Sequence, residues 1–225
     1  MTLDISRIKA LCFDVDGTLS DTDDMWVTNF TKTLSPLRFF APNGDLTRAA
    51  RWMIMALESP GNVFYEAFDR IHLDDDIAKL YNTIAHRHLG KKPKKFWIIP
   101  GVLEMLSFMI HKYPMTVVSA RDDYSTNLFL NQFEIRSLFK SVITAQSCTY
   151  TKPFPDPVIL AATQMGVSPE QCLMIGDTTV DIRAGKTAGA QTVGVLCGFG
   201  TERELRKAGA DMILKSTGDL LDLFL

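Results

Sequence analysis

Short runs of apolar residues, each followed by a polar loop, recur along the sequence. They lie at residues 9–14, 115–119, 141–144, 172–176, 192–195 and 211–214. Within these runs apolar side chains occupy consecutive positions, so both faces of each strand would be apolar, which is typical of parallel strands in the middle of a domain. We therefore expect the runs to form a parallel sheet that helices cover on both faces.

Between these runs the apolar residues follow the spacing of a helix. One stripe comprises Val102, Leu103, Leu106, Met109 and Ile110, and a second comprises Val158, Ile159, Ala162 and Met165. Gly166 directly follows the second stripe, and glycine commonly ends helices. Strands that alternate with helices predict a doubly wound α/β sheet of the Rossmann type, in which ligands bind at the carboxyl ends of the strands.

The segment from residue 20 to residue 95 breaks this alternation, because it carries helical spacing and no strand pattern. One helix is indicated along residues 46–57, and another along residues 73–88. The second begins with aspartates and ends with basic side chains, which the helix dipole favours. We expect an all-helical cap domain at residues 20–95, inserted into an α/β core formed by residues 1–19 and 96–225.

Composition and charge narrow the class of protein. The chain has 225 residues, of which 46% are apolar and 22% charged, as in soluble globular proteins. Its formal net charge of −2 argues against nucleic-acid binding, which requires an excess of cations. The longest apolar stretch, residues 97–110, is interrupted by proline, glycine and glutamate, so we expect no membrane partner.

The four cysteines show no disulfide or metal-binding spacing. They are Cys12, Cys148, Cys172 and Cys197. We interpret them as reduced thiols that mostly pack in the core, and the N-terminus has no long apolar region of the kind found in signal peptides. Both observations favour a cytoplasmic protein.

Four polar motifs follow predicted strands and carry the candidate chemistry. They are Asp14-Val-Asp-Gly-Thr-Leu19, Ser119, Lys152, and Gly176-Asp-Thr-Thr-Val-Asp181. If the strands are parallel neighbours, all four meet at one edge of the sheet. Several carboxylates, one ammonium and one hydroxyl would then share one pocket.

This set of groups points to phosphoryl transfer with a metal ion. Crowded carboxylates repel each other unless a cation is present, and oxygen ligands without histidine or cysteine favour Mg²⁺. Asp177 and Asp181 are four residues apart, so they would face the same way if a helix begins at Asp177. One aspartate could attack phosphorus and another protonate the leaving oxygen, while the lysine and Mg²⁺ neutralise phosphoryl oxygens.

In their order and residue types, these four motifs resemble those of the haloacid dehalogenase-like superfamily. The resemblance covers residues 7–19 and 97–225, and from Thr151 to Gly200 it is similar to the phosphoglycolate phosphatase-like branch. That branch carries a helical cap in the position of residues 20–95. The resemblance implies an α/β core and a phosphatase that acts on a small phosphorylated metabolite.

The resemblance also implies a role for each acidic or basic motif residue. Asp14 would be the nucleophile and a Mg²⁺ ligand, and Asp16 would be the general acid and base and give its backbone carbonyl to the metal. Asp177 would be a further metal carboxylate, and Asp181 would hold a metal-bound water. Lys152 would bridge the phosphoryl group and Asp14.

Other residues would contact the substrate. The resemblance implies that Ser119 and the amide of Ala120 bind the phosphoryl group, and that Thr18 shapes the loop around it. Many relatives carry asparagine after the serine, whereas this chain has Ala120-Arg121, which leaves the contacts to the leaving group open. Arg121 is a candidate for binding an anionic substrate, and so are Arg48 and Arg51 in the predicted cap.

Alternative activities remain within the same resemblance. The residues Asp16 and Asp177 favour phosphate esters over carbon–halogen bonds, because the dehalogenases of the superfamily lack an aspartate at the first position and use no metal. A phosphomutase similar to β-phosphoglucomutase would pass the phosphoryl group to a second hydroxyl. A catalytically silent binding module on the same fold is the third alternative, and the presence of all four motifs speaks against it.

Overall fold

In the part of the chain that the structure describes, six parallel strands form one sheet. The computed structural model describes residues 3–21 and 96–225. The strands are β1 (Ala10–Phe13), β2 (Met115–Val118), β3 (Ser141–Ile143), β4 (Cys172–Gly176), β5 (Gln191–Val195) and β6 (Met212–Leu214). Their order in the sheet is β3-β2-β1-β4-β5-β6, and every neighbouring pair is parallel. The predicted doubly wound α/β sheet is therefore confirmed, each predicted run matching a strand to within about two residues.

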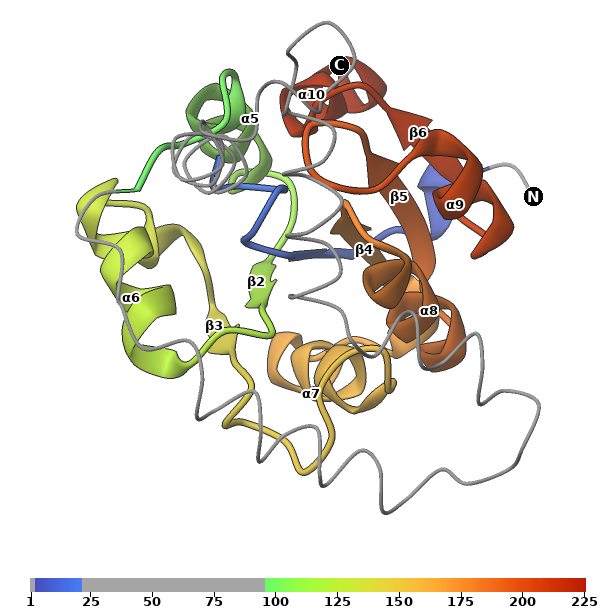
Figure 1. Ribbon diagram of the computed structural model, residues 1–225, viewed down its shortest axis with the longest axis horizontal. Helices are drawn as coiled ribbons and strands as arrows, with labels where there is room; N and C mark the ends of the chain where they lie inside the picture. Colours follow the sequence, from blue (N-terminus) through green and yellow to red (C-terminus); the bar gives the residue numbers. More distant parts are fainter. Residues whose placement is uncertain (1–2, 22–95) are drawn as a thin grey trace, which may run out of the picture. The chain divides into compact units, whose positions relative to one another are not determined.

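Helices follow the strands along the chain (Figure 1). They are α5 (Val102–Met109), α6 (Asp123–Gln132), α7 (Asp156–Met165), α8 (Thr179–Ala188), α9 (Glu202–Lys207) and α10 (Leu220–Phe224). The two stripes of the sequence correspond to α5 and α7, and Gly166 ends α7 in the left-handed region, at a φ of 79°. These two predicted helices and this predicted end are confirmed.

The sheet is apolar on both faces because two helical layers cover it. On one face Leu11 and Phe13 of β1 belong to a core cluster with side chains of α5, α6 and α10. On the other face Cys12 packs in a cluster with side chains of α7 and α8. Since successive side chains of a strand point to opposite faces, this arrangement explains why neighbouring positions in each run are apolar. In Figure 1, α5 and α10 lie on one side of the strands and α7 and α8 on the other.

The chain divides into two units, Met1–Thr22 with Phe96–Leu225 and Asp23–Lys95. In the first unit the segments that leave and re-enter it are paired, because Ser20 and Ile98 form an antiparallel bridge. The amide of Asp21 donates to the carbonyl of Trp97 at 2.9 Å. The predicted helical cap, with Arg48 and Arg51, lies outside the described residues apart from its first two positions.

All four cysteines are free thiols, as the sequence predicts, and Cys12 and Cys172 are buried in the sheet. Across residues 3–21 and 96–225, no helix combines the length and the apolar character that a membrane span requires.

Candidate active site

The strand order brings three of the four polar motifs to adjacent positions. β1 lies between β2 and β4, so Asp14, Ser119 and Asp177 follow three neighbouring strands. The amide of Asp14 donates to the carbonyl of Ile175 at 2.9 Å, and the amide of Ser119 to that of Ile143 at 2.9 Å. These two hydrogen bonds continue the pairing of the sheet by one residue beyond β1 and β2. They therefore fix the backbone positions from which the side chains of Asp14 and Ser119 extend.

The fourth motif reaches the same place through the side chain of Lys152. Its Nζ donates to Oδ1 of Asp14 at 2.5 Å and to Oδ1 of Asp181 at 2.6 Å. The lysine side chain is 2% exposed. Burial disfavours the ammonium, but the Asp14 and Asp181 carboxylates outweigh it and raise the pKa of Lys152 well above its ordinary value. The lysine therefore stays charged and joins the first and last motifs.

Even with this lysine, negative charge is in excess. One carboxylate oxygen from each of Asp14, Asp177 and Asp181 lies within 4.8 Å of the others, and all three residues are buried. Burial raises the pKa of Asp14 to about 7, and the carboxylates of Asp181 and Asp16 add to the rise while Lys152 opposes it. Three buried oxygen donors with one balancing ammonium fit a hard divalent cation. A cation there would favour the ionised form of Asp14.

Asp177 is enclosed by backbone on both sides. Its Oδ2 accepts from the amide of Phe199 at 2.9 Å, and its Oδ1 from the hydroxyl of Thr18 at 3.4 Å. A Cβ atom on Gly17 would come within 2.4 Å of Oδ2, and one on Gly198 within 2.1 Å. Glycine is therefore required at both positions for the loops after β1 and β5 to close around this carboxylate.

Asp181 faces the cluster for a different reason from the one that its spacing suggests. The helix does not begin at Asp177: it begins at Thr179, and Thr178 is its N-cap. Asp181 is the third helical residue, and its Oδ2 accepts from the amide and the hydroxyl of Thr178 at 3.0 and 2.6 Å. This capping box turns the carboxylate back toward the helix start, so the two aspartates meet without sharing a helix face.

The loop after β2 carries the phosphoryl-binding candidates. Ser119 is buried, and its Oγ accepts from the amide of Arg121 at 3.1 Å, whereas Ala120 is exposed. The guanidinium of Arg121 pairs with the carboxylate of Asp16, and its Cζ lies 5.1 Å from the centre of the Phe96 ring. The serine is thus tied to an arginine that reaches the second aspartate of the first motif.

Sequence reasoning missed several supporting residues. The pattern Thr178-x-x-Asp181 is a recognisable capping signal and could have corrected the helix start. Thr217 is fully buried, and its hydroxyl donates to the carbonyl of Thr18 at 2.6 Å. The thiol of Cys197 donates to the carbonyl of Gly17 at 3.3 Å. No short-range pattern predicts these last two contacts, because their partners lie about 180 to 200 positions away along the chain.

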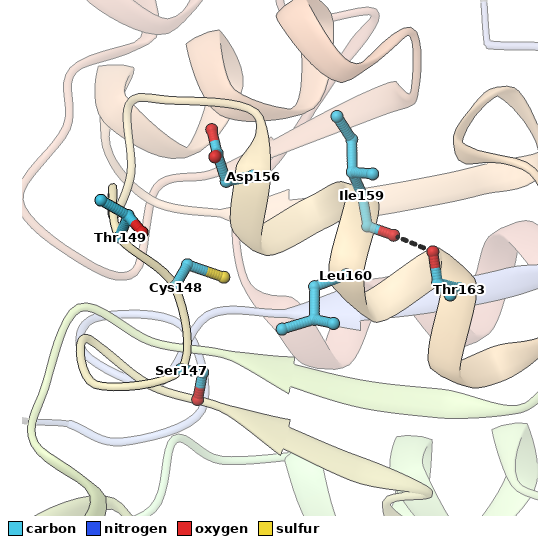
Figure 2. A pocket seen from close by; sticks show the side chains of 7 residues that line it. All are labelled: Ser147, Cys148, Thr149, Asp156, Ile159, Leu160 and Thr163. Carbon is cyan, nitrogen blue, oxygen red and sulfur yellow. Dashed lines mark hydrogen bonds between the residues drawn. The ribbon is translucent and has the colours of Figure 1, made fainter.

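A separate surface hollow of about 480 Å³ lies between α7 and the loop before it. Figure 2 shows the residues that line it, with the Thr163 hydroxyl bonded back to the carbonyl of Ile159 inside the helix. Burial raises the pKa of the Cys148 thiol in this hollow, and the Asp156 carboxylate raises it further. Both effects disfavour the thiolate, which is the reactive form of a cysteine.

A doubly wound parallel sheet with clustered aspartates and a buried lysine at the carboxyl ends of its strands has the residues of a phosphoryl-transfer site on an α/β fold. The chain matches the haloacid dehalogenase-like hydrolase family over residues 11–195 and belongs to that family. The resemblance inferred from the four motifs is confirmed.

Curated relatives and solved structures extend this comparison. The chain is 29% identical over 219 residues to pyrophosphatase PpaX of Anoxybacillus flavithermus, covering 96% of this chain and 97% of the relative. It is 26% identical to phosphoglycolate phosphatase of Escherichia coli O157:H7, covering 95% and 91%. A haloacid dehalogenase-like hydrolase structure from Streptococcus pneumoniae matches with a TM-score of 0.68 at 22% identity, covering 98% and 100%, which shows the shared fold.

Proposed function

We propose that the protein is a Mg²⁺-dependent phosphatase that hydrolyses a small phosphorylated metabolite through a phosphoryl-aspartate at Asp14. One observation carries this proposal: Asp14 is buried at the end of the central strand, bonded to Lys152 and grouped with Asp177 and Asp181. The names of the relatives, pyrophosphatase and phosphoglycolate phosphatase, support a small phosphorylated substrate.

In the first half of the proposed reaction, a carboxylate oxygen of Asp14 attacks phosphorus. The bond from phosphorus to the leaving oxygen breaks, and Asp16 gives that oxygen a proton. Ser119 and the amide of Ala120 bind the phosphoryl oxygens, and Thr18 keeps the loop in place. Lys152 stabilises the negative charge that develops on those oxygens.

In the second half, water attacks the phosphorus of the acyl phosphate. Asp16, now ionised, accepts the proton of the attacking water, and the bond between phosphorus and Asp14 breaks. Inorganic phosphate leaves, and both aspartates return to their starting states. The overall reaction consumes the substrate and one water molecule and requires no oxidant. The residues at this edge of the sheet, together with a bound cation, would be enough to carry it out.

The cation that suits these ligands is Mg²⁺. Asp14 and Asp177 would hold it with their carboxylates, Asp16 with its backbone carbonyl, and Asp181 through a water molecule. When bound, Mg²⁺ supplies positive charge that neutralises phosphoryl oxygens. Zinc is a poorer match because, among the residues that the structure describes, neither histidine nor cysteine accompanies the three carboxylates.

Substrate selection and cellular location complete the proposal. Residues 20–95 would form a helical cap that excludes bulk water, and Arg48 and Arg51 would bind the anionic part of the substrate from this cap.

The four free cysteines fit a reducing compartment, so we propose that the protein acts in the cytoplasm.

A phosphate-release assay tests this function. The panel comprises pyrophosphate, phosphoglycolate, sugar phosphates and nucleoside monophosphates, each with Mg²⁺ and with a chelator. We expect Mg²⁺-dependent release from at least one compound and none from Asp14→Asn. Release that survives this substitution would exclude the nucleophile, isomerised sugar phosphate without free phosphate would indicate a mutase, and an inactive wild type would favour a binding module.

A further inference from the structure

The backbone of Arg121 is held on both sides. Its amide donates to Oγ of Ser119 at 3.1 Å, and its carbonyl accepts from the amide of Ala145 at 3.0 Å. The next residue, Asp122, caps α6 by accepting from the amide of Ser125 at 3.0 Å. The backbone of Arg121 is therefore held in a fixed position beside Ser119, the serine that would bind the phosphoryl group.

The side chain of Arg121 is also held in place. It is 14% exposed, with the guanidinium paired to Asp16 and its Cζ 5.1 Å from the centre of the Phe96 ring. The amide of Phe96 donates to Oε1 of Gln132 at 3.1 Å, and its carbonyl accepts from Nε2 of that glutamine at 2.8 Å. A guanidinium pre-organised in this way loses little rotamer freedom when it binds a ligand.

These contacts place Arg121 on one particular side of the reacting phosphorus. Its backbone adjoins Ser119, which would bind the phosphoryl group, and its side chain touches Asp16, which would protonate the leaving oxygen. With a substrate bound in this way, the guanidinium would lie beside the leaving group. It already binds a carboxylate, and its five N–H donors in one plane allow different edges to bind Asp16 and a second oxyanion.

Resting on the proposed phosphatase function, we propose that Arg121 is a specificity residue that binds a negative charge on the leaving group. Phosphoryl compounds whose leaving group carries a carboxylate or phosphate are then favoured over compounds with an uncharged one. An uncharged leaving group cannot form the charge-assisted hydrogen bond to Arg121. Its loss corresponds to a preference of roughly 10- to 100-fold in kcat/KM for substrates with a charged leaving group.

A matched pair of substrates tests the proposal. 2-Phosphoglycolate and 2-phosphoglycolamide have nearly the same size and differ in the charge of the leaving group, and pyrophosphate adds a phosphate leaving group. The measured quantity is the ratio of kcat/KM for the charged substrates to kcat/KM for the amide. The control is Arg7→Gln, because Arg7 is an exposed arginine that donates to the carbonyl of Glu170 at the opposite edge of the sheet.

We expect the wild type and Arg7→Gln to share a ratio of roughly 10 or more, and Arg121→Gln to bring the ratio close to one. Arg121→Lys keeps the positive charge but lacks the planar, forked donors of the guanidinium, so it should give an intermediate ratio. It therefore tests the specificity role even if the glutamine variant does not fold. An unchanged ratio in both variants, or equal cleavage of both substrates by the wild type, overturns the specificity role and leaves the phosphatase function intact. A wild type that releases phosphate from no substrate overturns the phosphatase function and this inference with it.

Discussion

Asp14 allows the cation site to be tested without knowledge of the substrate. Its pKa of about 7 lies above the ordinary value of 3.8 because burial and two carboxylates oppose its ionisation. Mg²⁺ needs the ionised form, so protons and Mg²⁺ compete for the same oxygen. We expect the stabilisation of the wild type by Mg²⁺ to be large above neutral pH and small well below it.

The size of this effect follows from the pKa. With Mg²⁺ at about 100 times its dissociation constant, binding stabilises the folded protein by about 2.7 kcal/mol at about pH 8. At about pH 5 roughly one Asp14 in a hundred is ionised, so affinity falls about 100-fold and the stabilisation drops to about 0.4 kcal/mol. For a protein of this size these values correspond to increases in Tm of about 5–10 °C and about 1 °C.

The assay is thermal unfolding with Mg²⁺ or a chelator at both pH values. Asp14→Asn should lose the Mg²⁺-induced shift, and Asp222→Asn, at an exposed position in α10, should keep it. In the absence of metal, the folded state holds a proton on Asp14 between about pH 4 and 7 that the unfolded state lacks. The contribution of Asp14 to stability is therefore complete below about pH 4 and is lost as the pH rises through 7. Equal shifts at both pH values, or a full shift in Asp14→Asn, would refute this explanation.

Three substitutions probe the residues around the cation site. Lys152→Met leaves the buried carboxylates without their ammonium and should lower the free energy of unfolding of the metal-free protein by about 3–5 kcal/mol in a urea titration; a loss below about 1 kcal/mol would contradict the pairing. Gly198→Ala forces a Cβ atom to within 2.1 Å of Oδ2 of Asp177 and should weaken Mg²⁺ binding in a titration, and an unchanged affinity would show that the loop relaxes freely. Thr217→Val removes the bond to the carbonyl of Thr18 and should lower the free energy of unfolding by about 1–3 kcal/mol, whereas Thr217→Ser should keep it; equal losses in both variants would assign the effect to packing.

The sequence predicts the sheet well because the buried strands carry a local signal. Consecutive apolar residues such as Leu11, Cys12 and Phe13 reflect helices on both faces, and Gly166 marks the end of α7 in the sequence itself. The positions of Asp14, Ser119 and Asp177 at one edge follow from the rule that ligands meet the carboxyl ends of parallel strands.

The sequence predicts the side-chain geometry of the site less well. Spacing alone suggested that Asp177 and Asp181 share a helix face, but the capping box of Thr178 delays the helix and turns Asp181 back. The pairing of Arg121 with Asp16 joins residues 105 positions apart, and no local pattern encodes it. Such contacts depend on how loops from different strands pack, and therefore become visible only once the fold is known.

Acid quenching during turnover tests the proposed role of Asp14. The protein is mixed with Mg²⁺ and the best substrate of the panel and then quenched, and its peptides are examined by mass spectrometry. We predict that a phosphoryl group is found on the peptide that contains Asp14 in the wild type, and on no peptide of Asp14→Asn. A phosphoryl group on another residue, or the same labelling in both proteins, would contradict the assignment of Asp14 as the nucleophile.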